Sequence, residues 1–228
     1  MANRLEKPDA DDDLYLARGD EVPPSRPLMT GDVFPAVEIP GVLPNPTVAL
    51  VVTHPCSMRS DGVHLAPLVH LALVEPCEPV PWASCPRDRM PLPSLRAGNA
   101  FHVVRLDVIG MTDPSLLKLD ARIACMSVRG INLLQQRLIW YFTRLEAPTA
   151  QLTPLFAPVF EEVDLQEEWV EAAISAGTDV GTAIEDFHDW IRAADDGGLR
   201  RQDRLRDPQA RAMVRRELSA ETRRRYVV

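Results

Sequence analysis

Three side chains that can do chemistry stand close together in the stretch HPCSMR, between residues 54 and 59. A cysteine attacks as its thiolate, and a neighbouring base or cation lowers the thiol pKa so that the thiolate forms. His54 could act as general base, Cys56 as nucleophile, and Arg59 could stabilise developing negative charge. If the protein is an enzyme, we predict its catalytic site at these residues. In the opposing interpretation Cys56 is a small buried side chain and backbone groups bind His54.

Histidines and cysteines are also potential ligands for a soft metal ion. The candidates in the first 125 residues are His54, Cys56, His64, His70, Cys77, Cys85, His102 and Cys125. Zinc ligands usually occur in pairs separated by roughly two to five residues. His64 and His70 fit this spacing loosely, whereas Cys77 and Cys85 do not. The sequence therefore predicts neither a metal site nor a cofactor.

The C-terminal 30 residues contain ten arginines and four carboxylates, although the whole chain has a net charge of −8. Such a basic segment is typical of a contact with an acidic partner, either nucleic acid or the acidic part of the chain itself. Five arginines of a predicted C-terminal helix are candidates for binding nucleic-acid phosphates: Arg211, Arg215, Arg216, Arg223 and Arg224. Docking of this helix on the chain's own carboxylates explains them equally well. The carboxylates that could serve are Glu161, Glu162, Glu167 and Glu168.

The elements that must position these residues change character along the chain. The unbroken apolar run from Val48 to Val52 predicts a buried strand that ends directly before His54. Alternating or apolar patterns predict further strands at residues 31–39, 64–74, 101–109 and 121–127. Pro35 makes the first of these an edge strand or a bulged one. Residues 76–98 contain six prolines and are expected to be irregular.

After residue 127 the apolar period changes from two to 3.6. Helices are predicted at residues 131–145, 165–175, 178–194 (capped by Thr178) and 208–225. The separation of strands from helices indicates an α+β protein. We expect three parts: a loosely ordered acidic and Pro-rich arm over residues 1–29, a β domain with a closing helix over 30–146, and a helical extension over 147–228.

Composition narrows the class of protein further. An apolar fraction of 46% and a charged fraction of 25% are ordinary for a soluble globular chain. No apolar run approaches the ~20 residues that span a bilayer, and the N-terminus lacks the pattern of a signal peptide. We therefore expect a cytoplasmic protein without membrane contact, whose four cysteines are free thiols.

Three features together resemble the PemK/MazF toxin family over residues 30–146: the tetrapeptide Gly31-Asp32-Val33-Phe34, the strand VALVV followed by threonine, and a β-rich half closed by an amphipathic helix. Members of this family are small, strongly bent barrels, typically dimeric endoribonucleases of toxin–antitoxin systems that act without metal. The resemblance implies a bent antiparallel barrel of five or six strands over residues 30–127, binding or cleavage of RNA, and a homodimer.

One part of the family's pattern is missing from this chain. In the family, the loop after the first strand carries charged residues, including a catalytic arginine, whereas PGVLPNP here carries none. His54, Arg59 and His64 are left to serve as acid, base and cation. A second hypothesis is therefore a non-catalytic protein-interaction or regulatory subunit of a larger assembly, which explains the missing catalytic set and the uneven charge.

Overall fold

The apolar run becomes strand β3 (Thr47–Val51), the middle strand of a seven-stranded sheet, in the computed structural model of the chain. Ala49, Leu50 and Val51 are fully buried, as predicted for an apolar strand with a neighbour on each side. The structure describes residues 5–42, 45–59, 64–96, 101–195 and 197–226.

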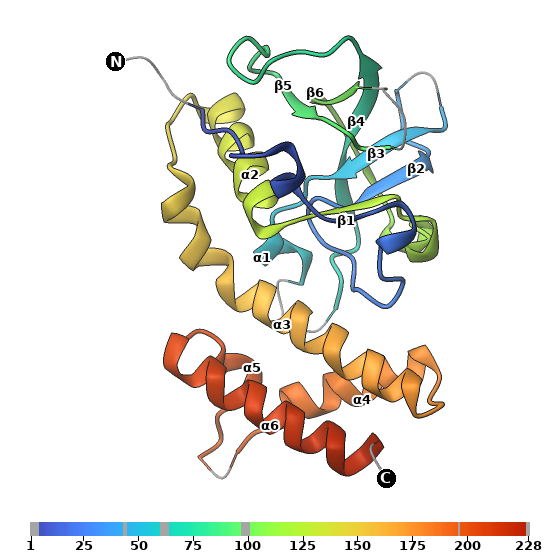
Figure 1. Cartoon of the computed structure of the whole chain (residues 1–228), viewed down its shortest axis with the longest axis vertical. Coiled ribbons are helices and arrows are strands. Elements are labelled where there is room, and N and C mark those ends of the chain that lie inside the picture. The colour runs from blue at the N-terminus through green and yellow to red at the C-terminus, as the bar shows by residue number, and fades with distance from the viewer. Residues whose placement is uncertain (1–4, 43–44, 60–63, 97–100, 196, 227–228) are drawn as a thin grey trace. The chain divides into compact units, whose positions relative to one another are not determined.

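All paired strands run antiparallel, in the order β1-β7-β2-β3-β4-β6-β5 (Figure 1). The other strands are β1 (Tyr15–Arg18), β2 (Val33–Val37), β4 (Val69–Cys77), β5 (Arg89–Leu92), β6 (Phe101–Thr112) and β7 (Ala124–Met126). The pairing of β4 with β6 shifts register between Ala72 and Leu73, where β6 contributes extra residues. Such a bulge bends a strand and increases its twist. The sheet accordingly curls into a half-barrel.

The two edge strands of the half-barrel approach each other through side chains. On β1, the Tyr15 hydroxyl donates a hydrogen bond to the Pro93 carbonyl at 3.0 Å, and Arg18 donates to the Ser94 carbonyl at 2.8 Å. Both carbonyls directly follow β5. The curl is therefore fastened by side chains at its open side.

The helices are α1 (Pro55–Met58), α2 (Val128–Thr143), α3 (Thr149–Ser175), α4 (Val180–Arg192), α5 (Arg201–Arg204) and α6 (Pro208–Tyr226). The chain divides into unit 1, residues 1–24 and 28–153, and unit 2, residues 25–27 and 154–228. Unit 1 holds the sheet and α2, and unit 2 is helical. The α+β class is thus confirmed. No helix of the described residues has the length and apolarity to cross a membrane.

The core of unit 2 is built from one face of each long helix. Its members are Leu165, Trp169, Phe187, Trp190, Ile191, Leu205, Val214 and Leu218. The segment 25–27 belongs to this unit because Arg26 pairs with Glu167 at 2.5 Å and with Asp164 at 3.5 Å.

The strand prediction needs two corrections. Six strands lie within residues 30–127, in agreement with the five or six expected there, but a seventh, β1, precedes residue 30, and β5 lies inside the segment 76–98, which the sequence predicts to be irregular. The expectation of a loosely ordered arm over residues 1–29 is wrong for its described part, where Leu14, Leu28 and Met29 are buried. Strand β1 is not predicted because its apolar alternation is only four residues long and directly follows a run of acidic residues.

Two helix boundaries also differ from the prediction. Helix α3 begins sixteen residues earlier than expected and continues through Pro154 and Pro158. Because these prolines are four residues apart, their missing N–H donors fall on one face of the helix, and the opposite face keeps its hydrogen bonds. Helix α4 is capped by Asp179, which accepts the Thr182 N–H at 3.0 Å, and not by Thr178.

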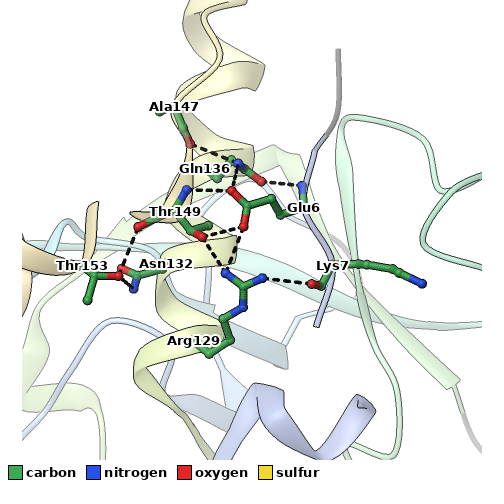
Figure 2. Close-up of polar contacts among 8 residues, drawn as sticks. All are labelled: Glu6, Lys7, Arg129, Asn132, Gln136, Ala147, Thr149 and Thr153. Atoms are coloured by element: carbon green, nitrogen blue, oxygen red, sulfur yellow. Dashed lines mark hydrogen bonds and ion pairs between the residues drawn. The ribbon is translucent and has the colours of Figure 1, made fainter. Parts of the chain in front are cut away.

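The described N-terminal segment is fastened to unit 1 by the carboxylate of Glu6 (Figure 2). This carboxylate accepts hydrogen bonds from the Thr149 N–H at 2.8 Å, the Thr149 hydroxyl at 2.6 Å and Arg129 at 3.0 Å. Gln136 accepts the Glu6 N–H at 2.7 Å and donates to the Ala147 carbonyl at 3.0 Å. The network joins the N-terminal segment to α2 and to the first turn of α3.

Gly31 and Asp32 form a buried turn before β2. Gly31 has φ of +87°, and a Cβ at this position would lie 2.6 Å from the Met126 Cβ. The Asp32 carboxylate accepts hydrogen bonds from Arg122 at 2.7 Å and from the Met29 N–H at 2.9 Å. The Gly-Asp dipeptide therefore has a structural role in this chain, as a left-handed turn followed by a buried ion pair.

We expect Gly31→Ala to destabilise unit 1 strongly, because the substitution combines backbone strain with a steric clash against Met126. Gly41→Ala is the matched control, since Gly41 has φ of +79° and no atom within 4 Å of an added Cβ. Backbone strain alone should lower the free energy of unfolding by about 1–2 kcal/mol in the control, and the clash should add about 1–3 kcal/mol at Gly31. Hydrogen exchange of β2 and β7 amides measures unit 1 separately. Equal losses in both variants would contradict the predicted clash.

Replacing Glu6 by glutamine should make the stability of unit 1 less dependent on pH. Burial alone would raise the pKa of the Glu6 carboxyl, but hydrogen bonds from Thr149 and Arg129 hold it below its usual value. Folding therefore favours the charged form. The stabilisation is complete above the unfolded-state pKa of ~4.3 and is lost as pH falls through the lower folded-state pKa.

At neutral pH the E6Q variant should have a free energy of unfolding about 1 kcal/mol below wild type, and the two proteins should converge in acid. Urea unfolding across pH, read by exchange of the Thr149 amide, measures the difference. Asp9→Asn is the control, because it removes an exposed charge from the same segment. A difference that stays constant down to pH ~2 would show that the charge of Glu6 is not what matters.

Candidate functional site

The strand β3 delivers His54, Cys56 and Arg59 to a single short turn, as the sequence predicts. His54 is the residue before α1, and its Nδ1 accepts a hydrogen bond from the Cys56 N–H at 3.3 Å. The preceding Thr53 is buried and accepts the His70 N–H through its hydroxyl at 2.6 Å. Both side chains therefore bind backbone donors at the end of the strand.

The electrostatic setting of this turn does not activate the thiol. Burial raises the pKa of the Cys56 thiol, and burial lowers the pKa of His54. No neighbouring cation contributes to the change at Cys56. The residue as a whole is exposed, so the thiol is accessible, and its raised pKa leaves it protonated at neutral pH. The catalytic role of His54, Cys56 and Arg59 stays a prediction.

The potential metal ligands do not gather in the part of the chain that the structure describes. No group of three or more histidine, cysteine, aspartate or glutamate side chains there is placed to hold a metal ion. All four cysteines are free thiols, two of them buried.

The predicted nucleic-acid-binding arginines lie along α6 and differ in their surroundings. Arg215 pairs with Glu161 at 2.7 Å, Arg224 pairs with Glu221 at 2.5 Å, and Arg211 donates to a backbone carbonyl. Arg216 and Arg223 are exposed and have no carboxylate partner among the described residues. The pairing of Arg215 with Glu161 is the docking contact that the alternative interpretation expects. A nucleic-acid role for the five arginines stays a prediction.

A cluster of aromatic rings and cations that the sequence analysis did not identify lies at the end of α2. The guanidinium carbons of Arg87 and Arg144 each lie 4.5 Å from the ring centroid of Trp140. Arg144 also lies 5.7 Å from the Tyr141 ring, whose centroid is 5.0 Å from that of Phe142. We call these five residues the α2 cluster.

Two reciprocal stacks dock the β4–β5 loop against α2. The loop contributes Arg87 to Trp140 of the helix, and it contributes Trp82, whose ring centroid lies 4.9 Å from the guanidinium of Arg137 on the helix. Arg137 is 2% exposed and donates to the Arg89 carbonyl at 2.9 Å. Burial lowers the pKa of Arg137 to about 10, so the guanidinium remains charged at neutral pH.

Positive charge in the α2 cluster is not neutralised within the described residues. Neither Arg87 nor Arg144 has a carboxylate partner there, and both are exposed. Arg144 is fixed at the C-cap of α2 with φ of +63°, where its N–H donates to the Trp140 carbonyl at 2.8 Å. The cluster therefore presents two guanidinium groups, kept in place by stacking, beside aromatic rings. This arrangement is suited to an anionic ligand.

The sequence contains one part of the pattern that could have revealed this cluster. Residues Arg137, Trp140 and Arg144 lie three and four apart, which places them on one helical face. The other part, Trp82 and Arg87, lies some fifty residues earlier in a Pro-rich loop. Only the folded loop brings the two together.

Comparison with known proteins does not identify a relative. No family model matches the sequence, and no curated protein is significantly similar to it. The function of this chain is therefore inferred from the geometry of its own residues.

Thiol labelling as a function of pH tests the state of Cys56. We expect the labelling of Cys56, obtained as the difference between wild type and Cys56→Ser, to have its midpoint above the ~8.5 of a free thiol, because burial disfavours the thiolate. The same measurement in urea is the control and should return the midpoint to ~8.5. A folded-state midpoint well below that value would show an activated nucleophile.

Proposed function

We propose that unit 1 is a diverged PemK/MazF-like module that binds single-stranded nucleic acid through the α2 cluster. The observation that carries the proposal is the stacking of Arg87 and Arg144 on Trp140, with no carboxylate partner for either cation among the described residues. The curled antiparallel half-barrel supports the family part of the proposal, since it is compatible with a small bent barrel.

The α2 cluster offers both kinds of contact that single-stranded nucleic acids need. Guanidinium groups bind phosphate oxygens and release counterions, whereas aromatic rings stack on bases. Arg87 and Arg144 would supply the first contact. Phe142, which is 66% exposed, and the half-buried Tyr141 beside it would supply the second.

Binding without cleavage fits the turn at His54 better than catalysis does. RNA cleavage by proton transfer needs a base that can take a proton and a cation beside the phosphate. The Nδ1 lone pair of His54 accepts the Cys56 N–H, so the neutral ring carries its proton on Nε2. The lone pair on Nδ1 is therefore directed at the chain's own backbone.

A protein-interaction role is the second candidate, and one observation favours it. Phe142 and Leu145 at the end of α2 are each 66% exposed. Exposed aromatic, leucine and arginine side chains beside one another also occur where proteins bind each other, and Trp, Tyr and Arg dominate such interfaces. The test of nucleic-acid binding distinguishes the two candidates.

Binding of a fluorescent oligouridylate of about 12 nucleotides, measured from low to moderate salt, tests the proposal. The double variant Arg87→Ala/Arg144→Ala should bind at least about tenfold more weakly. Its plot of log affinity against log salt should be shallower by about 0.7 for each phosphate that the variant no longer neutralises. Phe142→Ala should weaken binding without changing this slope, because stacking releases no counterions.

The double variant Arg216→Ala/Arg223→Ala is the matched control, since it removes two exposed arginines from α6. Wild-type affinity in this control locates the site at the α2 cluster, whereas weaker binding in this variant alone would place the site on α6. Absence of binding even at low salt would exclude the nucleic-acid proposal and leave protein interaction. Cleavage of the oligonucleotide, abolished in His54→Ala, would show an endoribonuclease.

A further inference from the structure

Helix α6 has two opposite faces with different chemistry. Val214, Leu218 and Thr222 are buried and recur every four residues, so they face the core of unit 2. Its carboxylates lie near this inner side: Glu217 pairs with Arg204 at 2.7 Å, and Glu221 pairs with Arg225 at 2.6 Å. The acidic residues of α6 are thus engaged within the unit.

The outward face of α6 is hollowed into a shallow groove. Its lining residues are Ala212, Arg215, Arg216, Ser219, Ala220 and Arg223. They recur at intervals of three and four, so they form one stripe about three turns, or ~16 Å, long. The floor of the groove is formed by the small residues Ala212, Ser219 and Ala220, and the three arginine side chains form its rims.

The charge of the groove is positive and only partly compensated. Among its three arginines, Arg215 pairs with Glu161, while Arg216 and Arg223 have no carboxylate partner in the described residues. No carboxylate of α6 lies among the lining residues. An occupant therefore needs negative charge along both rims and small side chains over the floor.

We propose that this groove binds an acidic amphipathic helix of a partner protein. Small residues let two helices approach closely, so that the ridges of one fit the groove of the other. Arginines beside such a seam are placed to pair with glutamates of the incoming helix, as charges flanking a coiled-coil seam do. The groove lies wholly in unit 2 and does not depend on the function proposed for unit 1.

An acidic helix fits the groove better than a nucleic acid does. No aromatic residue lines it, so bases have nothing to stack on. Tyr226, the aromatic residue of α6, packs its ring 5.8 Å from that of Trp169 and donates to Asp186.

The test uses the full chain and a fluorescent helical peptide of about three heptads, with alanine at the seam positions and glutamate beside them. We expect saturable binding that weakens with salt, and no binding of the same peptide with glutamine in place of glutamate. Arg223→Glu should weaken binding about tenfold, because repulsion replaces attraction at the rim. Arg206→Glu is the matched control, since Arg206 is exposed in the same unit outside the groove, and it should bind as wild type.

Three outcomes would overturn the proposal. The first is absence of binding of the glutamate peptide to wild type at low salt. The second is equal weakening by Arg223→Glu and Arg206→Glu, which would indicate a general charge effect. The third is binding of a duplex oligonucleotide that Arg223→Glu abolishes while the peptide does not compete, which would assign the groove to nucleic acid.

Discussion

The buried ion pair between Asp32 and Arg122 is the constraint on which unit 1 depends most. Its side chains are 1% and 0% exposed, and the Arg122 guanidinium also donates to the Pro23 carbonyl at 2.8 Å. Burial raises the pKa of the Asp32 carboxyl, and the cation beside it opposes that change. Removing one partner from such a pair typically costs about 3–5 kcal/mol, because the other charge stays buried without compensation. The pair therefore fixes the segment before β2 to the approach of β7.

The sequence predicts those parts of the fold that local pattern determines. The run Val48–Val52 indicates β3 because a strand with two neighbours must be apolar on both faces. The 3.6 period gives α2 to within a few residues, and Pro208 correctly marks the start of α6. Strand β1 is different, because four residues between acidic segments carry too little pattern, and pairing with β7 across more than a hundred residues is what orders them.

Sequence reasoning is less informative for the candidate site, for two physical reasons. The proximity of His54 to Cys56 is visible in the sequence, but the hydrogen bond to the histidine Nδ1 and the partial burial that raises the thiol pKa depend on the fold. The α2 cluster depends on a contact between α2 and a loop some fifty residues away. Periodic patterns within a short window of sequence cannot predict a contact between residues so far apart. In both cases residue type shows what chemistry is available, and tertiary contacts decide whether it is used.

The hydrogen bonds from Tyr15 and Arg18 to the carbonyls after β5 bear on whether the sheet can recruit a strand from another molecule. An open sheet presents unpaired backbone groups along its outer strands, and these groups can recruit a strand from another molecule. Here the curl turns both margins toward each other, and two backbone carbonyls directly after β5 already accept hydrogen bonds from an aromatic hydroxyl and a guanidinium of β1. A strand from another molecule would have to displace these donors before it could add to the sheet. The half-barrel thereby gains resistance to aggregation without closing a backbone ladder.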